Sequence, residues 1–355
     1  MTDVRAINRD FEKYDQVRKG HTYRLAEDED DAFDDDYGIA MLDFARFLNG
    51  SEADKADFAE EFAAALREIG FAVLTGHGVD PALYDDIHDG VIDLFTTTSM
   101  AEKMRFRAER FGSVAQGYFP LEETSEIHPD LVEGWVWCRR AFDIPQEREA
   151  QFRAGDFWPR ADYEPMFRRL VLAHEPLFKP IMQAMLQGLG LNPYAYDEKL
   201  TRTNFGLRLN YYPPMSEAQD QSGAGRLFGH EDVDLFTILP ASRVDGLQVW
   251  NHRTAKWVRM RAPYGSIIIN TGDYMQRITN DLLPSTTHRV GKPSDRSHLT
   301  SARVSFPLAV YVWEDEVLEV LPGLGEPKYP PVKAIAFHTR STSKFYGDDY
   351  AVDVA

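Results

Sequence analysis

The sequence predicts a mainly β protein with flanking helices, in which the strands form a sandwich or a barrel. Many short segments between residues 203 and 317 are rich in β-branched and aromatic residues and are separated by Gly, Pro, Asn or Asp. Residues 38–200 instead show mainly the apolar spacing of helices. With 355 residues, of which 43% are hydrophobic, the chain can bury a substantial core. Periodicity alone does not name the topology of the strands.

The chain divides into four stretches. Residues 1–37 form an acidic amino-terminal arm, because the run 27–36 is crowded with Asp and Glu whose charges repel one another. A solvated arm or loop is expected there, and an acidic docking segment is the alternative. Residues 38–200 are expected to be mainly helical and to pack on the strands of residues 201–320, because no Gly/Ser-rich linker separates them. Residues 321–355 form a carboxy-terminal extension.

Two helical regions have recognisable ends. In residues 54–69 the apolar residues recur at helical spacing, and Gly70 suits the left-handed position that follows a helix. A second helical region near 164–190 contains Pro176 and Pro180, which should break or kink it. The apolar residues assigned to the core in the first helix are Phe58, Phe62, Leu66 and Ile69.

The expected strands are short. Two of them, near 39–43 and 71–75, lie within the mainly helical stretch. The others are expected at 204–212, 235–239, 247–250, 256–260, 266–270, 286–290 and 303–312.

The composition limits the class of partner and the compartment. A formal net charge of −18 argues against nucleic acid or an anionic membrane, since both require a basic surface. The single cysteine, Cys138, rules out an intramolecular disulfide framework. The first residues lack a signal-peptide pattern, and no apolar run is long enough to cross a bilayer. A cytoplasmic enzyme acting on a small molecule is therefore expected.

The strongest chemical signal is a possible metal site. His230 and Asp232 are separated by one residue, so in an extended strand both side chains point to the same side. His288 follows on a second expected strand. Two imidazoles and one carboxylate are the ligand set of mononuclear non-haem Fe(II) oxygenases, which leave the opposite face of the ion open. A closed structural zinc site would require a fourth protein ligand, and none is identified.

The remaining histidines fit no ligand pattern. His77 lies before the expected barrel, in Gly-His-Gly, and a structural hydrogen-bonding role is expected for it. The others are expected at the surface or in ordinary hydrogen bonds: His21, His88, His128, His174, His252, His298 and His338.

Eight short patterns occur along the chain: Ile39–Asp43, Gly70–Gly78, Asn210–Pro214, His230–Asp232, Gly246–Val249, Asn270–Asp273, His288–Val290 and Arg303–Ser305. In these patterns and their order the sequence resembles the 2-oxoglutarate/Fe(II)-dependent dioxygenases of the isopenicillin N synthase-like family. The resemblance covers most of the chain. It implies a double-stranded β-helix, or jelly roll, with iron near its mouth and helices packed outside.

The resemblance also implies an activity. Fe(II), 2-oxoglutarate and O2 would together oxidise a C–H bond of a small organic substrate, giving succinate and CO2. Hydroxylation, desaturation and cyclisation all stay open. Arg303 and Ser305 share one strand face, where they would bind the distal carboxylate of 2-oxoglutarate. Asn210 and Tyr212 match the family's Asn-x-Tyr pair in the same pocket. An ordinary buried ion pair is the alternative for Arg303.

Candidate residues of the substrate wall follow from strand parity. Arg208 shares a face with Asn210 and Tyr212, and Ala309 and Tyr311 share one with Arg303 and Ser305. Tyr118 belongs to the region that usually covers the pocket mouth in the family. A buried guanidinium requires an anionic partner, so Arg208 predicts either a substrate carboxylate or a structural salt bridge.

Two other functions fit the same residues. An oxidase of the same fold would bind Fe(II) without using 2-oxoglutarate, and such enzymes keep an Arg-x-Ser pair. A non-catalytic jelly-roll binding protein is the second alternative, although such proteins usually lose a metal ligand. Here all three ligands are present.

Overall fold

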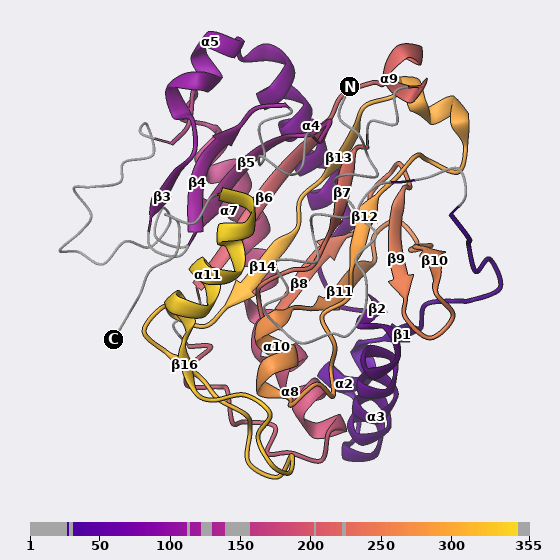
Figure 1. Ribbon diagram of the computed structural model, residues 1–355, viewed down its shortest axis with the longest axis vertical. Helices are drawn as coiled ribbons and strands as arrows, with labels where there is room; N and C mark the ends of the chain where they lie inside the picture. Colours follow the sequence, from indigo (N-terminus) through magenta and orange to yellow (C-terminus); the bar gives the residue numbers. More distant parts are fainter. Residues whose placement is uncertain are drawn as a thin grey trace.

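The computed structural model describes residues 27, 31–111, 114–121, 130–138, 157–201, 204–221 and 225–346. Within them, two β-sheets face each other and helices cover the larger sheet (Figure 1). The ten-stranded sheet has the order β1 (Met41–Asp43), β2 (Phe71–Thr75), β11 (Ile267–Thr271), β8 (Phe236–Pro240), β14 (Leu308–Tyr311), β6 (Asn204–Tyr212), β5 (Glu133–Cys138), β4 (Val114–Phe119) and β3 (Glu109–Phe111), and β13 (Arg303–Ser305) also pairs with β6. The four-stranded sheet has the order β10 (Lys256–Arg259), β9 (Leu247–Asn251), β12 (His288–Val290) and β7 (Leu227–His230).

The helices lie mainly in the amino-terminal half. They are α2 (Ala45–Asn49), α3 (Glu52–Ile69), α4 (Pro81–Thr97), α5 (Met100–Lys103), α7 (Tyr163–His174), α8 (Phe178–Gly188), α9 (Glu217–Gln221), α10 (Asp273–Ile278) and α11 (Ala334–Tyr346). Short 3-10 helices occupy η2 (Met104–Phe106), η5 (Glu175–Leu177) and η6 (Arg296–Thr300), and a small hairpin joins β15 (Val317–Leu318) to β16 (Val332–Lys333). None of the described helices is long and apolar enough to cross a membrane.

The core has two parts. Apolar residues of β2 and β11 meet those of β9 and β10 between the two sheets. A larger cluster fills the space between the ten-stranded sheet and helices α3, α4, α7 and α8. Two sheets that are antiparallel except for the β1–β2 pair face each other, with helices packed outside. This is the jelly-roll arrangement that the resemblance predicts.

The two predicted helix ends are confirmed. Helix α3 begins with a capping box between Ser51 and Asp54 and ends at Gly70, whose φ of 73° is left-handed. The second helical region is interrupted at Glu175–Leu177, around Pro176, where a 3-10 turn separates α7 from α8. Pro180 lies in the first turn of α8, where a missing backbone N–H removes no helical hydrogen bond.

The fold differs from the expectation in several places. Strand β7, which ends at His230, is not among the expected strands, and Asp232 lies in the loop after it rather than on a strand. The segment 109–138, expected within a mainly helical stretch, supplies β3, β4 and β5 to the large sheet. The expected strand 303–312 is divided, because Phe306 and Pro307 interrupt it between β13 and β14. A proline has no N–H for a sheet ladder. The Pro307 carbonyl instead accepts a 3.0 Å hydrogen bond from the Arg208 N–H.

The acidic arm is not wholly solvated, which corrects the expectation for its described residues. The Asp31 side chain is only 2% exposed and forms a 2.6 Å salt bridge with Arg289, the residue after His288. The Arg289 guanidinium also lies 3.8 Å from the centre of the Trp257 ring. Glu27 accepts a 2.6 Å hydrogen bond from the backbone N–H of Lys292. The arm therefore docks on the four-stranded sheet of its own chain. Residues 1–26, 28–30 and 347–355 lie outside the described part.

Candidate metal centre and its cavity

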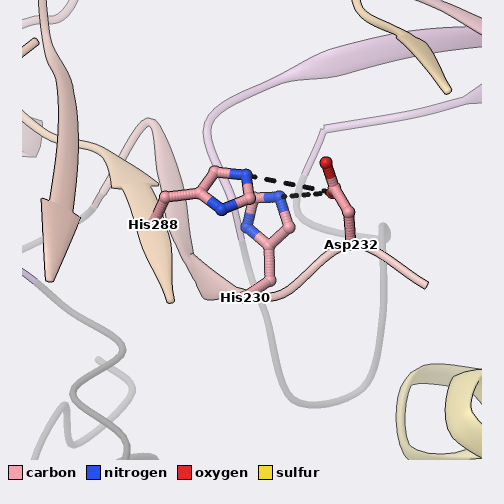
Figure 2. A group of neighbouring side chains, drawn as sticks. All are labelled: His230, Asp232 and His288. Atoms are coloured by element: carbon pink, nitrogen blue, oxygen red, sulfur yellow. Dashed lines mark ion pairs between the residues drawn. The ribbon is translucent and has the colours of Figure 1, made fainter. Parts of the chain in front are cut away.

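His230, Asp232 and His288 come together at the mouth of the two facing sheets (Figure 2). His230 is the last residue of β7, Asp232 lies in the loop that follows, and His288 begins β12 directly opposite His230. The Nε2 atoms of both histidines lie 3.8 Å from Oδ1 of Asp232. One potential ligand atom from each residue falls within 4.8 Å of the others. A single ion can therefore contact all three.

The hydrogen bonds of the two imidazoles fix the tautomer that a metal requires. Nδ1 of His230 donates to the Phe228 carbonyl at 2.9 Å, and Nδ1 of His288 donates to the Thr286 carbonyl at 3.0 Å. Each Nε2 thus keeps its lone pair toward Asp232. Burial, aided by the neighbouring His288, lowers the pKa of His230 to about 4, so this imidazole is neutral at pH 7. Two imidazoles whose Nε2 atoms face one carboxylate form a ligand set that fits a divalent cation.

A second layer of residues orients Asp232. Its Oδ2 accepts hydrogen bonds from Thr237 Oγ1 at 2.7 Å and Asn270 Nδ2 at 2.8 Å, so Oδ1 is the oxygen that faces the histidines. Burial opposes ionisation of Asp232, but His288, His230 and these hydrogen bonds outweigh it and lower its pKa. Asp234 Oδ2 lies 2.6 Å from the same Thr237 hydroxyl. Burial and the Asp232 charge raise the pKa of Asp234 well above its ordinary value.

Arg303 lies at one end of the cavity, on β13 opposite Tyr212 of β6. Its Nε donates to the carbonyls of Val244 and Asp245 at 3.1 and 3.2 Å, and its guanidinium lies 4.9 Å from the centre of the Tyr212 ring. Its Nη1 is buried without a hydrogen-bond partner. Ser305 Oγ lies 3.4 Å from the Tyr212 hydroxyl. A buried cation with an unused donor beside two hydroxyls fits a ligand carboxylate.

The cavity between the sheets has a volume of about 240 Å³. The two sets of residues that strand parity assigned to the cavity, one on β6 and one on β13 and β14, both line its wall. The predicted residues that line it are His230, Asp232, His288, Arg208, Asn210, Tyr212, Arg303, Ser305, Ala309 and Tyr311. Tyr118 does not line it, because its hydroxyl turns away and donates a 2.6 Å hydrogen bond to Glu133. The adjacent Phe119 lines the cavity instead.

Arg208 lies on β6 with its guanidinium 5.6 Å from the centre of the Phe119 ring. Its Nε donates a 2.8 Å hydrogen bond to Oδ1 of Asn210, and its Nη2 is buried without a hydrogen-bond partner. Within the described residues, no carboxylate oxygen lies within 4.0 Å of this guanidinium. The structural salt bridge considered for Arg208 is therefore not found in that part of the chain.

Sequence reasoning missed several wall residues, among them Asp130, His338 and Thr342. Asp130 precedes β5, and its Oδ1 accepts a 2.8 Å hydrogen bond from the Phe228 N–H. His338 and Thr342 come from one face of α11, which crosses the large sheet near β14 (Figure 1). The His338 ring packs edge-on against Tyr311 at 5.2 Å. No strand pattern marks these residues, since only the tertiary fold brings them to the cavity.

His77 has the structural role expected for it. Its Nε2 donates to the Gly265 carbonyl at 2.9 Å, and its Nδ1 accepts from the Val79 N–H at 3.2 Å. These bonds tie the loop after β2 to the loop before β11, away from the metal centre.

Comparisons with known proteins agree with this geometry. Residues 203–310 match the 2OG-Fe(II) oxygenase superfamily, and residues 39–161 match the amino-terminal family described as non-haem dioxygenase in morphine synthesis. The 2-oxoglutarate-Fe(II) type oxidoreductase ppzD of Metarhizium majus is 28% identical, over 75% of this chain and 82% of its own length.

Solved structures share the fold. A full-length Neurospora crassa protein, crystallised in complex with alpha-KG and thymine, has a TM-score of 0.75 at 20% identity, over 90% of this chain and 100% of that one. A 2OG-Fe(II) oxygenase family protein of Caulobacter crescentus has a TM-score of 0.73 at 26% identity, covering 86% of this chain and 99% of that one. The chain belongs to the 2OG-Fe(II) oxygenase superfamily and is an oxidoreductase that uses Fe(II) and 2-oxoglutarate.

Proposed function

We propose that the chain oxidises a C–H bond of a small anionic substrate held beside the metal centre, with succinate and CO2 as co-products. The residues proposed to hold Fe(II) are His230, Asp232 and His288. The residues proposed to hold 2-oxoglutarate are Arg303, Ser305, Tyr212 and Asn210. Bound there, Fe(II) supplies the activation of dioxygen that is coupled to decarboxylation of 2-oxoglutarate.

The protein contributes geometry and charge. His230, Asp232 and His288 would hold Fe(II) through one ligand atom each and would leave room at the ion for 2-oxoglutarate and dioxygen. Thr237 and Asn270 hold Asp232 so that one defined oxygen faces the ion. Arg303 pairs its unused Nη1 with the distal carboxylate, which orients the other end of 2-oxoglutarate toward the metal.

One observation supports an anionic substrate: Arg208 lines the cavity, and its buried Nη2 has no protein acceptor among the described residues. Burying an unpaired guanidinium is costly, and a substrate carboxylate or similar acceptor removes that cost. The cavity of about 240 Å³ limits the substrate to a small molecule. Ala309, Tyr311, His338 and Thr342 would form the wall around the rest of it.

A screen tests this proposal. Small carboxylic and amino acids, each paired with its neutral amide or ester, are added to purified protein with Fe(II), 2-oxoglutarate and oxygen, and succinate is measured. We expect stimulation by an acid and little by its amide, and a loss of that preference in Arg208→Leu. Stimulation by neutral compounds alone would overturn the anionic assignment and leave the reaction class intact.

The two alternatives predict different products. An oxidase that does not use 2-oxoglutarate consumes oxygen without forming succinate, and a binding protein consumes no oxygen in the presence of Fe(II). We place the reaction in the cytoplasm, which can supply Fe(II); cell fractionation of the producing organism tests this location.

A further inference from the structure

Arg226 is a second buried arginine near the proposed 2-oxoglutarate site. It immediately precedes β7 and is 1% exposed. Its Nη2 donates to the carbonyls of His298 and Ser301, at 3.4 and 3.1 Å. Its Nε and Nη1 are buried and have no hydrogen-bond partner. Arg226 does not reach the cavity wall, so it lies one layer behind it.

Arg226 and Arg303 are electrostatic neighbours. The backbone that Arg226 holds, at His298 and Ser301, leads directly into Arg303 on β13. Burial, and next the charge of Arg303, lower the pKa of Arg226 to about 10, so both guanidiniums are protonated at pH 7. Among the residues that the structure describes, neither guanidinium has a carboxylate oxygen within 4.0 Å. The charge of Asp245 opposes the lowering of both pKa values, but burial outweighs it, so the two arginines still favour an anion near Arg303.

We propose that Arg226 is a positioning residue for 2-oxoglutarate: it anchors the backbone that carries Arg303 and adds a second positive charge behind the distal carboxylate. This inference rests on the proposed cosubstrate role of Arg303. Its effect is confined to ligands with a carboxylate at that end. A 2-oxo acid that lacks the distal carboxylate binds the metal in the same way but gains nothing from Arg226.

Calorimetric titration of the full chain with Mn(II) in place of Fe(II) tests the inference without turnover. The two ligands are 2-oxoglutarate and 2-oxobutyrate, which share the metal-binding end. Arg226→Gln should raise the Kd of 2-oxoglutarate about tenfold, the loss expected for one charge-assisted contact, and change that of 2-oxobutyrate less than about twofold. Arg226→Lys keeps the positive charge, so its affinity for 2-oxoglutarate should fall only about threefold.

Two controls separate the possible failures. Arg277 is another buried arginine that donates to a backbone carbonyl, of Pro330, outside the cavity, so Arg277→Gln should leave both Kd values unchanged. Arg303→Gln should abolish the preference for 2-oxoglutarate over 2-oxobutyrate.

The inference is overturned if Arg226→Gln changes the Kd values of both ligands equally or changes neither. Arg226 would then only anchor the backbone. If Arg226→Gln does not fold, Arg226→Met takes its place, and an unchanged ligand preference in Arg226→Met overturns the inference. If the unaltered chain shows no preference, the cosubstrate proposal fails as well.

Discussion

Nε of Arg208 donates a 2.8 Å hydrogen bond to Oδ1 of Asn210. Because Nδ2 of the same Asn210 lies 3.4 Å from Ser305 Oγ, the amide connects the proposed substrate residue to the cosubstrate pocket. This contact holds the Arg208 guanidinium along β6, with its Nη2 beside Gly134 of the neighbouring strand β5. The Asn210 side chain thus contacts both Arg208 and Ser305, and all three residues line the cavity.

Arg208→Ala should raise the KM for an anionic substrate about tenfold or more, because one charged hydrogen bond is lost. The Kd of 2-oxoglutarate should change less than about threefold, since Asn210 keeps its contact with Ser305. Steady-state kinetics with the acid found by screening, together with calorimetry of 2-oxoglutarate, measures both. Equal losses in the two affinities would assign Arg208 to the scaffold.

Thr237→Val should weaken metal binding by roughly 10- to 100-fold, because Asp232 loses the hydroxyl that orients its carboxylate. Thr279→Val is a matched control: Thr279 is also buried, and its hydroxyl donates to the Met275 carbonyl outside the cavity. Competition for Mn(II) with a chromophoric chelator gives the affinities. A Thr237→Val protein that binds metal as tightly as the control contradicts the role of this hydrogen bond.

Asp130 should make stability depend on pH in a defined direction. Burial raises the pKa of Asp130 to about 8, although the Phe228 N–H and the Arg208 charge oppose that shift. The unfolded carboxyl has a pKa of about 3.9, so folding retains a proton between these values and stability falls as pH rises from about 4 to about 8.

Asp130→Asn removes this titration and keeps an acceptor for the Phe228 N–H. The variant should therefore gain unfolding free energy relative to the unaltered chain as pH rises, by at most about 1.4 kcal/mol per pH unit. Urea unfolding at pH 5, 6, 7 and 8 compares the two proteins. Parallel stability profiles would show that Asp130 is ionised in the folded chain throughout that range.

Asp31→Ala should destabilise the fold by roughly 3–5 kcal/mol, because it removes a buried carboxylate that pairs with the buried Arg289 guanidinium. Asp35→Ala removes a 2.6 Å ion pair with Arg259 from the same segment, but the Asp35 side chain is 64% exposed, so a loss of only about 0–1 kcal/mol is expected. Thermal or urea unfolding measures the loss of unfolding free energy in both variants. Equal, small losses would mean that the segment does not dock on the sheet in solution.

The sequence predicts most of the barrel side of the site because strand parity is local. Alternate residues from Gly206 to Tyr212 and from Arg303 to Tyr311 line one cavity, even though Pro307 divides the second strand. The helix that ends at Gly70 is likewise determined by spacing and a left-handed glycine.

Other features depend on contacts between distant residues. All six residues of β5 are buried, so no alternation distinguishes this strand from a buried helix. Asp31 looks solvated within an acidic run, and only its pairing with Arg289, distant in the sequence, buries it. His338 and Thr342 reach the cavity from α11, which no strand pattern predicts.

The central claim is that Fe(II) at His230, Asp232 and His288 uses 2-oxoglutarate held by Arg303. The most direct measurement is succinate formed per oxygen consumed, with purified protein, Fe(II), 2-oxoglutarate and the stimulating acid. We predict about one succinate per oxygen, none with His288→Ala, and a 2-oxoglutarate affinity weakened by roughly 2–5 kcal/mol in Arg303→Gln. Iron-dependent oxygen consumption without succinate, unchanged in Arg303→Gln, would contradict the account.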